Sequence, residues 1–193
     1  MDRKAEIIRK TNETDIVLKL DLDSSGGGAI DTGIPFFDHM LNSFRVHSRL
    51  YLDVTAKGDI EIDCHHTVED VGIALGCAIK EALGDKRGID RFASEYLPLD
   101  EALALCALDV SGRPHLTFNS PLVSGMVGDF DVQMTKEFFY AVAMNAGLTL
   151  HINVLYGDNY HHIVEAIFKA FARALKAAVK ITGTEVPSSK GWL

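Results

Sequence analysis

Two copies of one short motif carry the residue types best suited to chemistry in this chain. The first copy is His65-His66-Thr67-Val68-Glu69, and 96 positions later the 193-residue chain continues as His161-His162-Ile163-Val164-Glu165. Neutral imidazole nitrogens and carboxylate oxygens are ligands that borderline divalent ions such as manganese, iron or zinc accept. The repeated motif therefore predicts a metalloenzyme built by duplication. The alternative is that the histidines are capping or core residues, hydrogen-bonded at the starts of two helices.

Helix geometry points the side chains of each motif to two different sides of the helix. Residues four positions apart lie on one helix face, so His65 can share an ion with Glu69, and His161 with Glu165. The second histidine of each motif points about 100° away. In the simplest symmetric arrangement, each of two ions takes a His and Glu pair from one copy and the second histidine from the other copy. Further donors are expected from the helices that precede the motifs.

The elements that must position these ligands also repeat. Apolar residues follow each motif at helical spacing and share the offset of 96. Alternating apolar and polar residues predict strands around Leu20-Asp21-Leu22, after Glu13, and around Leu108-Asp109-Val110, after Glu101. A further helix in each half is expected over residues 34–46 and 135–146. The predicted order is a strand-rich segment, a helix, strands and a helix, repeated once.

Length and composition allow one compact unit or two closely packed halves. Hydrophobic residues make up 47% of the chain, and no low-complexity tract suggests a flexible linker. No long apolar run predicts a membrane span and no leader is recognisable, so the expected location is cytoplasmic. Three cysteines are too few and too scattered for a disulfide framework or a cysteine zinc site. A net charge of −8 argues against nucleic-acid binding.

Five separated segments of the chain resemble the imidazoleglycerol-phosphate dehydratase family of histidine biosynthesis. In chain order they are Pro35-Phe36-Phe37-Asp38-His39-Met40-Leu41, the first His-His motif with Asp70, Asp109-Val110-Ser111-Gly112-Arg113-Pro114, the second His-His motif with Ala166 and Phe168-Lys169-Ala170, and Pro187-Ser188-Ser189-Lys190-Gly191. The resemblance covers nearly the whole chain.

The resemblance implies a reaction, a metal and an assembly. Family members remove water from imidazole glycerol phosphate to give imidazole acetol phosphate. They use two manganese ions (Mn²⁺) per active site and form shells of 24 subunits that share sites between subunits. The implied fold is α+β and internally duplicated, like domain 2 of ribosomal protein S5. Each half, residues 1–93 and 94–193, would have a four-stranded sheet with two helices on one face, and the helices would pack between the sheets.

The same resemblance assigns metal ligands residue by residue. They are His39, His65, His66, Glu69, Glu137, His161, His162 and Glu165. Many family members have histidine where this chain has Glu137, and a carboxylate there can still bind manganese while adding negative charge. Cys64 stands where aspartate is common, and we interpret it as a small buried thiol rather than a ligand.

The family's substrate-binding positions account for most of the remaining motifs. They fall on Glu13, His47, Arg91, Arg113, Lys169, Ser189 and Lys190. Arginine suits a bidentate phosphate contact, and lysine and serine add a point charge and a short hydrogen bond. Without the resemblance, each basic residue would be interpreted as a solvated surface charge and the Ser-Ser-Lys-Gly segment as a disordered tail.

Dehydration also needs an acid for the departing hydroxyl and a base for the carbon-bound proton. Carboxylates near cations suit both tasks when their surroundings separate their pKa values. The candidate catalytic residues are Glu13, Glu69 and Glu165. His115 and His151 receive no role, and a structural or surface position is expected for both.

Two other function classes stay open at this point. A dinuclear metallohydrolase acting on a small phosphate ester would use the same ions to activate water, but the chain lacks the Asp-rich bridging motifs of such enzymes. A non-catalytic module that assembles on metal would explain the ligands but not the cluster of phosphate-binding positions.

Overall fold

The computed structural model describes residues 2–193, and its first half is built on one four-stranded sheet. Alternate residues of the long strands, such as Ile16, Leu18 and Leu20, point into the core while their neighbours face solvent. The strand order is β1-β2-β4-β3, with β3 parallel to β4. The strands are β1 (Lys4–Lys10), β2 (Thr14–Asp21), β3 (Ile30–Asp31) and β4 (Tyr51–Gly58).

The second half repeats this sheet. Its order, β5-β6-β10-β7, corresponds strand by strand to that of the first sheet, and its last pair is again parallel. A small two-stranded ribbon, β8 with β9, is added between β7 and the next helix. The strands are β5 (Phe92–Leu99), β6 (Ala102–Asp109), β7 (His115–Asn119), β8 (Met126–Val127), β9 (Phe130–Asp131) and β10 (Thr149–Tyr156).

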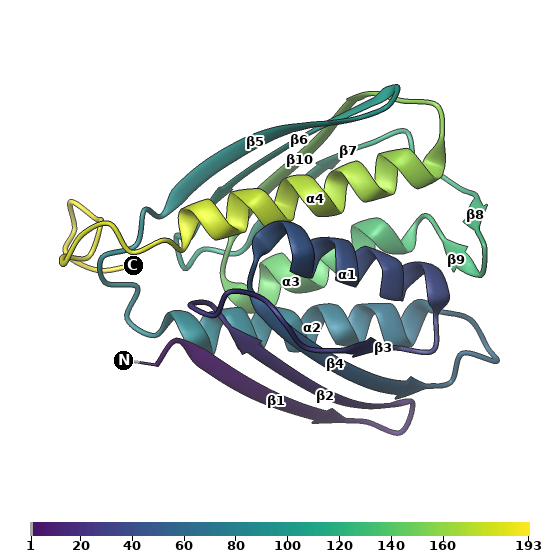
Figure 1. Ribbon diagram of the computed structural model, residues 1–193, viewed down its shortest axis with the longest axis horizontal. Coiled ribbons are helices and arrows are strands. Elements are labelled where there is room, and N and C mark those ends of the chain that lie inside the picture. Colours follow the sequence, from purple (N-terminus) through teal and green to yellow (C-terminus); the bar gives the residue numbers. More distant parts are fainter. Residues whose placement is uncertain (1) are drawn as a thin grey trace.

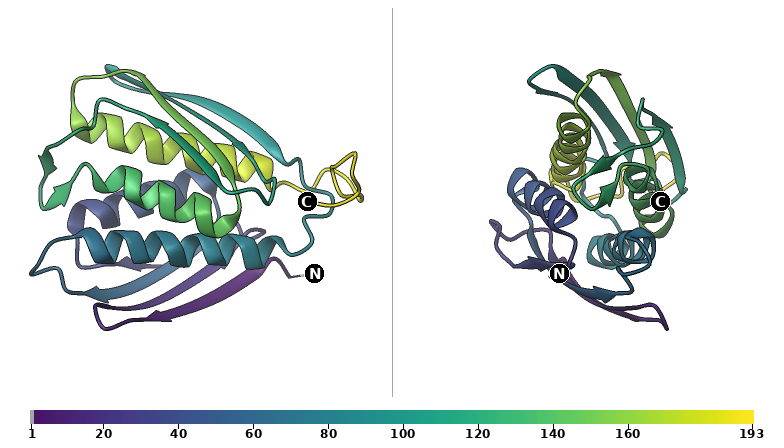
Figure 2. Two further views of the ribbon diagram at one scale, coloured as in Figure 1. Left: turned by 180° about the vertical axis from the view of Figure 1, so that it is seen from behind. Right: turned by 90° about the vertical axis from the view of Figure 1, so that its right-hand side faces the viewer.

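Four helices fill the space between the two sheets (Figures 1 and 2). They are α1 (Pro35–Ser48), α2 (His65–Leu83), α3 (Met134–Ala146) and α4 (Tyr160–Ala178). Helix α1 packs on α4, and α2 packs on α3, so each half contributes one helix to each pair. The predicted duplicated α+β fold, with helices sandwiched between sheets, is therefore confirmed. None of these helices is long and apolar enough to cross a membrane.

The two helix pairs pack differently. A Cβ added at Gly72 of α2 would lie 2.8 Å from the carbonyl oxygen of Phe138 on α3, so the two backbones approach closely. Gly76, one turn later, faces α3 in the same way. The positions 96 residues later in α4 carry Phe168 and Ala172. Phe168 is fully buried and its ring lies against the aromatic rings of α3.

The linker between the halves pairs with the C-terminal tail. The amide of Gly88 donates to the carbonyl oxygen of Glu185 (2.8 Å), and the amide of Thr182 donates to the carbonyl oxygen of Gly88 (2.8 Å). Gly88 has a φ of 74° and lies so close to Gly183 that a Cβ would be 2.2 Å from its carbonyl oxygen. The expected division at residues 93 and 94 falls inside β5 and stays a prediction.

Candidate active site

Three predicted metal ligands meet where α1 crosses the start of α4. Ligand atoms of His39, His161 and Glu165 all lie within 4.8 Å of one another. The Nε2 atoms of His161 and His39 are 3.3 Å and 3.8 Å from Oε2 of Glu165. Within residues 2–193, this is the one group of three such side chains close enough to share an ion. We call it the α4 cluster.

Local structure fixes the directions of these ligands. The side chain of Asn159 caps α4 by accepting hydrogen bonds from the amides of His161 (2.9 Å) and His162 (3.4 Å). Phe36 packs edge-on against the ring of His161, with centroids 5.1 Å apart. Pro35 at the start of α1 suits a first helical turn and places His39 one turn further. The cluster therefore forms from helix starts that the sequence itself specifies.

Lys169, one turn further along α4, contacts the α4 cluster at Glu165. Its Nζ lies 2.9 Å from Oε1 of Glu165, whose side chain is only 14% exposed. Burial alone would raise the pKa of the Glu165 carboxyl, but Lys169, followed by His39 and His161, lowers it overall. Glu165 is thus held as a carboxylate, the form that binds a cation.

The start of α2 carries the equivalent pair without the surrounding cluster. His65 Nε2 lies 3.5 Å from Glu69 Oε2, as the spacing predicts, and Asp63 caps the amide of His65 at 2.7 Å. Glu69 is 43% exposed, three times as much as Glu165. Glu137 lies half-buried in the first turn of α3, and in the described chain it belongs to no three-residue group. Its role as a ligand stays a prediction.

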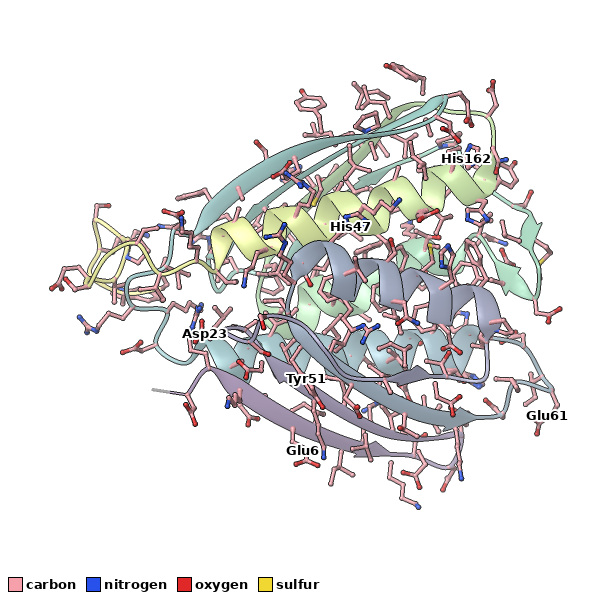
Figure 3. The ribbon with its side chains drawn as sticks, in the orientation of Figure 1. Glu6, Asp23, His47, Tyr51, Glu61 and His162 are labelled. Carbon is pink, nitrogen blue, oxygen red and sulfur yellow. The ribbon has the colours of Figure 1, made fainter. Side chains whose placement is uncertain are left out.

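The second histidine of each motif turns toward its own sheet. His66 Nδ1 is 3.0 Å from Asp59 and 3.9 Å from Glu13. His162, labelled in Figure 3 in the first turn of α4, places Nδ1 2.6 Å from Glu101. Hydrogen bonds to Asp59 and Glu101 raise the pKa of His66 and of His162. Within one chain neither ring joins the α4 cluster.

Asp59 and Glu101 are site residues that the sequence analysis missed. The bond to His162, together with the backbone amide of Asn159, lowers the pKa of Glu101 to about 2. A signal for Glu101 was present, because it stands in the second half where Glu13 stands in the first. Asp59 had none, since it follows β4 in an irregular loop.

Four of the predicted phosphate-binding residues line one pocket at the opposite end of the helices. Arg91 is fixed there by two hydrogen bonds to Asp109 (2.7 and 3.1 Å) and one to the carbonyl oxygen of Pro187 (2.7 Å). The pocket has a volume of about 490 Å³. Its charged and hydroxyl side chains come from Lys80, Lys86, Arg91, Ser111, Arg113, Ser188, Ser189 and Lys190. The sequence analysis missed Lys80 and Lys86, of which Lys86 lies in the linker loop.

His47 and Lys169 lie elsewhere, on the α1–α4 side of the molecule. His47, labelled in Figure 3, lines a groove of about 540 Å³ together with Arg49, Arg173 and Lys176. Burial, followed by the positive charges of Lys169 and Arg173, lowers the pKa of His47. Glu13, beside His66, lies apart from both, so the predicted substrate-binding residues occupy three separate places on one chain.

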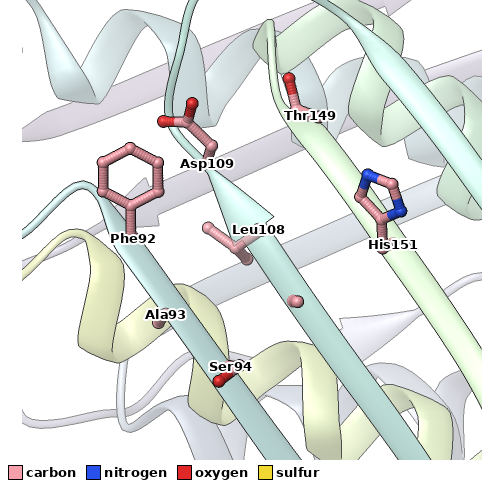
Figure 4. Close-up of a pocket in the computed structure, with 8 residues that line it drawn as sticks. Phe92, Ala93, Ser94, Leu108, Asp109, Thr149 and His151 are labelled. Atoms are coloured by element: carbon pink, nitrogen blue, oxygen red, sulfur yellow. The ribbon is translucent and has the colours of Figure 1, made fainter.

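A further groove, of about 520 Å³, crosses the outer face of the second sheet (Figure 4). His151 lines it, and its ring centroid is 5.8 Å from that of His115 on the neighbouring strand. Both histidines are exposed, which agrees with the structural or surface position expected for them. Cys64 is buried next to the start of α2, and burial raises the pKa of its thiol, which fits a structural position.

Comparison with known proteins identifies the family. The model of the imidazoleglycerol-phosphate dehydratase family matches residues 32–175. The imidazoleglycerol-phosphate dehydratase of Acetivibrio thermocellus is 57% identical, with all of both chains covered, and that of Azorhizobium caulinodans is 55% identical over 99% of this chain and 98% of its own.

Solved structures agree. The crystal structure of imidazoleglycerol-phosphate dehydratase from Staphylococcus aureus has a TM-score of 0.85 and 41% identity, and it covers 93% of this chain and 99% of its own. The crystal structure of IGPD from Pyrococcus furiosus in complex with (S)-C348 has a TM-score of 0.84 and 36% identity, with 97% and 100% covered. The chain therefore belongs to the imidazoleglycerol-phosphate dehydratase family, a family of lyases.

Proposed function

We propose that this protein dehydrates D-erythro-imidazole glycerol phosphate to imidazole acetol phosphate in histidine biosynthesis, using two manganese ions per active site. The observation that carries the metal part is the α4 cluster, in which His39, His161 and Glu165 converge within 4.8 Å. Family membership supports the reaction. A basic pocket containing Arg91 and Arg113 suits the phosphate of the substrate.

The donor set fits manganese. Two imidazoles and one carboxylate leave coordination positions open for a substrate and for ligands from elsewhere. When bound, the ions would supply Lewis-acid chemistry and a template for the imidazole ring. His65 and Glu69 would hold the second ion, together with His66, His162 and Glu137 as further candidate ligands.

The protein's own residues would bind the phosphate and move protons. Arg91 is preorganised, since Asp109 and the carbonyl oxygen of Pro187 fix its guanidinium before any ligand arrives. Lys169 keeps Glu165 deprotonated. Glu13 is the exposed carboxylate closest to the second histidine of the first motif, and it is our candidate for proton transfer at the substrate.

We also propose that each site is shared between subunits of an assembly, of 24 chains as the family implies. The support is a length argument. The backbone amide of Arg91 bonds to Ala178 at the end of α4, whereas His161 lies at the start of that helix. The helix has 19 residues and is therefore roughly 28 Å long. An imidazole ring joined to a three-carbon phosphate is much shorter, which supports a site that takes Arg91 from a second chain.

The test is to strip the purified protein of metal, titrate it with manganese and measure the formation of imidazole acetol phosphate. We expect activity to return as about two ions bind per chain. Tight binding of two ions without formation of this product would contradict the proposal. Release of inorganic phosphate instead would support the dinuclear metallohydrolase.

A further inference from the structure

The two halves present their sheet-edge carboxylates differently. Glu101, in the β5–β6 turn, is bound to His162 at 2.6 Å and accepts a hydrogen bond from the amide of Asn159 at 2.9 Å. Glu13, in the β1–β2 turn, has His66 at 3.9 Å as its nearest charged partner, and its side chain is 54% exposed. Hydrogen bonds to its carboxylate therefore fix the position of Glu101. The position of Glu13 depends instead on the backbone of the β1–β2 turn.

A chain of hydrogen bonds fixes that backbone. The hydroxyl of Thr11 accepts from the amides of Glu13 (3.1 Å) and Thr14 (3.0 Å). The hydroxyl of Thr14 lies 3.1 Å from that of Thr11 and donates to Oδ2 of Asp70 at 2.6 Å. Arg9 donates to Oδ1 of the same carboxylate at 2.7 Å. Both carboxylate oxygens of Asp70 are thus bonded to the strands that flank the turn, at Arg9 in β1 and Thr14 in β2.

Asp70 links this turn to the metal-ligand helix. It follows Glu69 directly on α2, and the residue is only 7% exposed. A buried carboxylate is costly unless hydrogen bonds and a positive charge satisfy it, so its contacts with Thr14 and Arg9 are strongly favoured. Movement of the Glu13 turn relative to α2 would break them. Glu13 and the ligands at the start of α2 are therefore held at a fixed separation.

The second half lacks this link. Where the first half has Arg9, Thr14 and Asp70, the repeat places Leu97, Ala102 and Ala166. These are apolar residues packed in or against the core, and they provide no directional bond. The link is therefore not required by the duplicated fold, and it occurs in the half whose turn carboxylate makes no hydrogen bond to a histidine.

We propose that Asp70, acting through Thr14, is a positioning residue for Glu13, setting this carboxylate against substrate held by the metal ligands. This inference rests on the proposed function for its catalytic consequence. A displacement of about 1 Å at a reacting group costs about 100-fold in rate, which gives such a link its value.

The first experiment compares Thr14→Val, which keeps the shape and removes the hydroxyl, with Thr14→Ser, which keeps the hydroxyl. In the assembled, manganese-loaded protein we expect Thr14→Val to lower kcat by about 10- to 100-fold. KM and bound manganese should change by less than about twofold. Thr14→Ser should restore most of kcat, and Asp70→Asn should resemble Thr14→Val. An unchanged kcat in folded, metal-loaded Thr14→Val would overturn the proposal.

The second experiment asks whether the link acts through Glu13. In a Glu13→Gln background, Thr14→Val should lower the residual rate by less than about threefold, because a positioning residue has nothing left to position. Losses that multiply would show an independent role and contradict us. Ser43→Ala is the matched control. It removes another buried hydroxyl, on α1, and should leave kcat unchanged.

A readout without turnover separates this inference from the proposed function. Amide hydrogen exchange of residues 11–14 should speed up in Thr14→Val and Asp70→Asn but stay unchanged in Thr14→Ser and Ser43→Ala. If the wild-type protein forms no imidazole acetol phosphate, the proposed function fails while the exchange data still decide whether Asp70 holds the turn. Unchanged exchange in both test variants would refute the link itself.

Discussion

The starts of α2 and α4 carry one motif in two different settings. At α4, His39 and Lys169 surround the His161 and Glu165 pair, and the carboxylate is mostly buried. At α2, the positions equivalent to His39 and Lys169 hold Glu137 and Ile73, and Glu69 stays exposed. Duplication has thus preserved the ligands while their neighbours diverged. The start of α4, with His39 from the first half, brings three candidate metal ligands together within one chain. The start of α2 instead has an open His65 and Glu69 pair near an anchored carboxylate, Glu13.

The largest expected difference between the halves concerns their two turn carboxylates. We expect Glu13→Gln to lower kcat by about 10²- to 10⁴-fold, the range for loss of a proton-transfer group, with manganese retained. Glu101→Gln should act mainly by loosening His162, so metal content should fall more than the kcat of fully loaded protein. Steady-state kinetics with metal analysis tests this. Equal losses of kcat in Glu13→Gln and Glu101→Gln at saturating manganese would contradict a functional difference between the halves.

Metal content tests the contrast between His39 and Glu137. His39→Ala removes one of three converging ligands, so bound manganese should fall from about two to about one per chain. Glu137→Ala should weaken binding less, since Glu137 belongs to no such group in the part of the chain that the structure describes. Elemental analysis after gel filtration gives both numbers. A larger loss from Glu137→Ala would mean that assembly recruits Glu137 into the stronger site.

The second histidines should matter in both halves. His66→Ala and His162→Ala should each reduce metal retention and activity, because the proposed two-ion scheme uses each ring as a metal ligand. Within one chain the two rings contact Asp59 and Glu101 instead. Metal titration of each variant beside wild type measures this. Full metal content with full turnover in either variant would make the two-ion scheme wrong.

A smaller effect is expected from the packing of the two helix pairs. Gly72→Ala should destabilise the protein by about 1–2 kcal/mol, because the added methyl would be pushed against α3 backbone and only part of that cost is offset by better helix propensity. Chemical denaturation measures the change in unfolding free energy. Gly183→Ala, at an open position, should change it by less than about 0.5 kcal/mol. A neutral Gly72→Ala would mean that α2 and α3 can separate slightly without loss.

Repeated spacing made the frame of this protein predictable. Helices expected over residues 34–46 and 135–146 occur as Pro35–Ser48 and Met134–Ala146, because helical periodicity and cap residues are local signals. Motif spacing predicted that His161 and Glu165 lie together, and the family resemblance added His39 as a candidate ligand. Alternation placed His151 on one face of a strand, and its ring is exposed.

What the sequence did not reveal depends on contacts between distant segments. Asp59 contacts His66 from a loop. Lys80, near the end of α2, and Lys86, in the linker, both line the basic pocket that contains Arg91. Asp70 shows the limit most clearly. An aspartate beside a ligand glutamate on a helix is readily interpreted as solvent-facing, and only the β1–β2 strands folded over α2 show that it is buried.

The pairing of linker and tail has a consequence for assembly. Copies of a duplicated chain at high local concentration can exchange halves, since the α1–α4 and α2–α3 contacts would form equally well between two chains. Such domain swapping requires the linker to open as a hinge. The tail closes it with backbone hydrogen bonds at Gly88, Asp90 and Arg91. The segment that ends in Ser189 and Lys190 therefore also resists opening of the linker between the two halves of the chain.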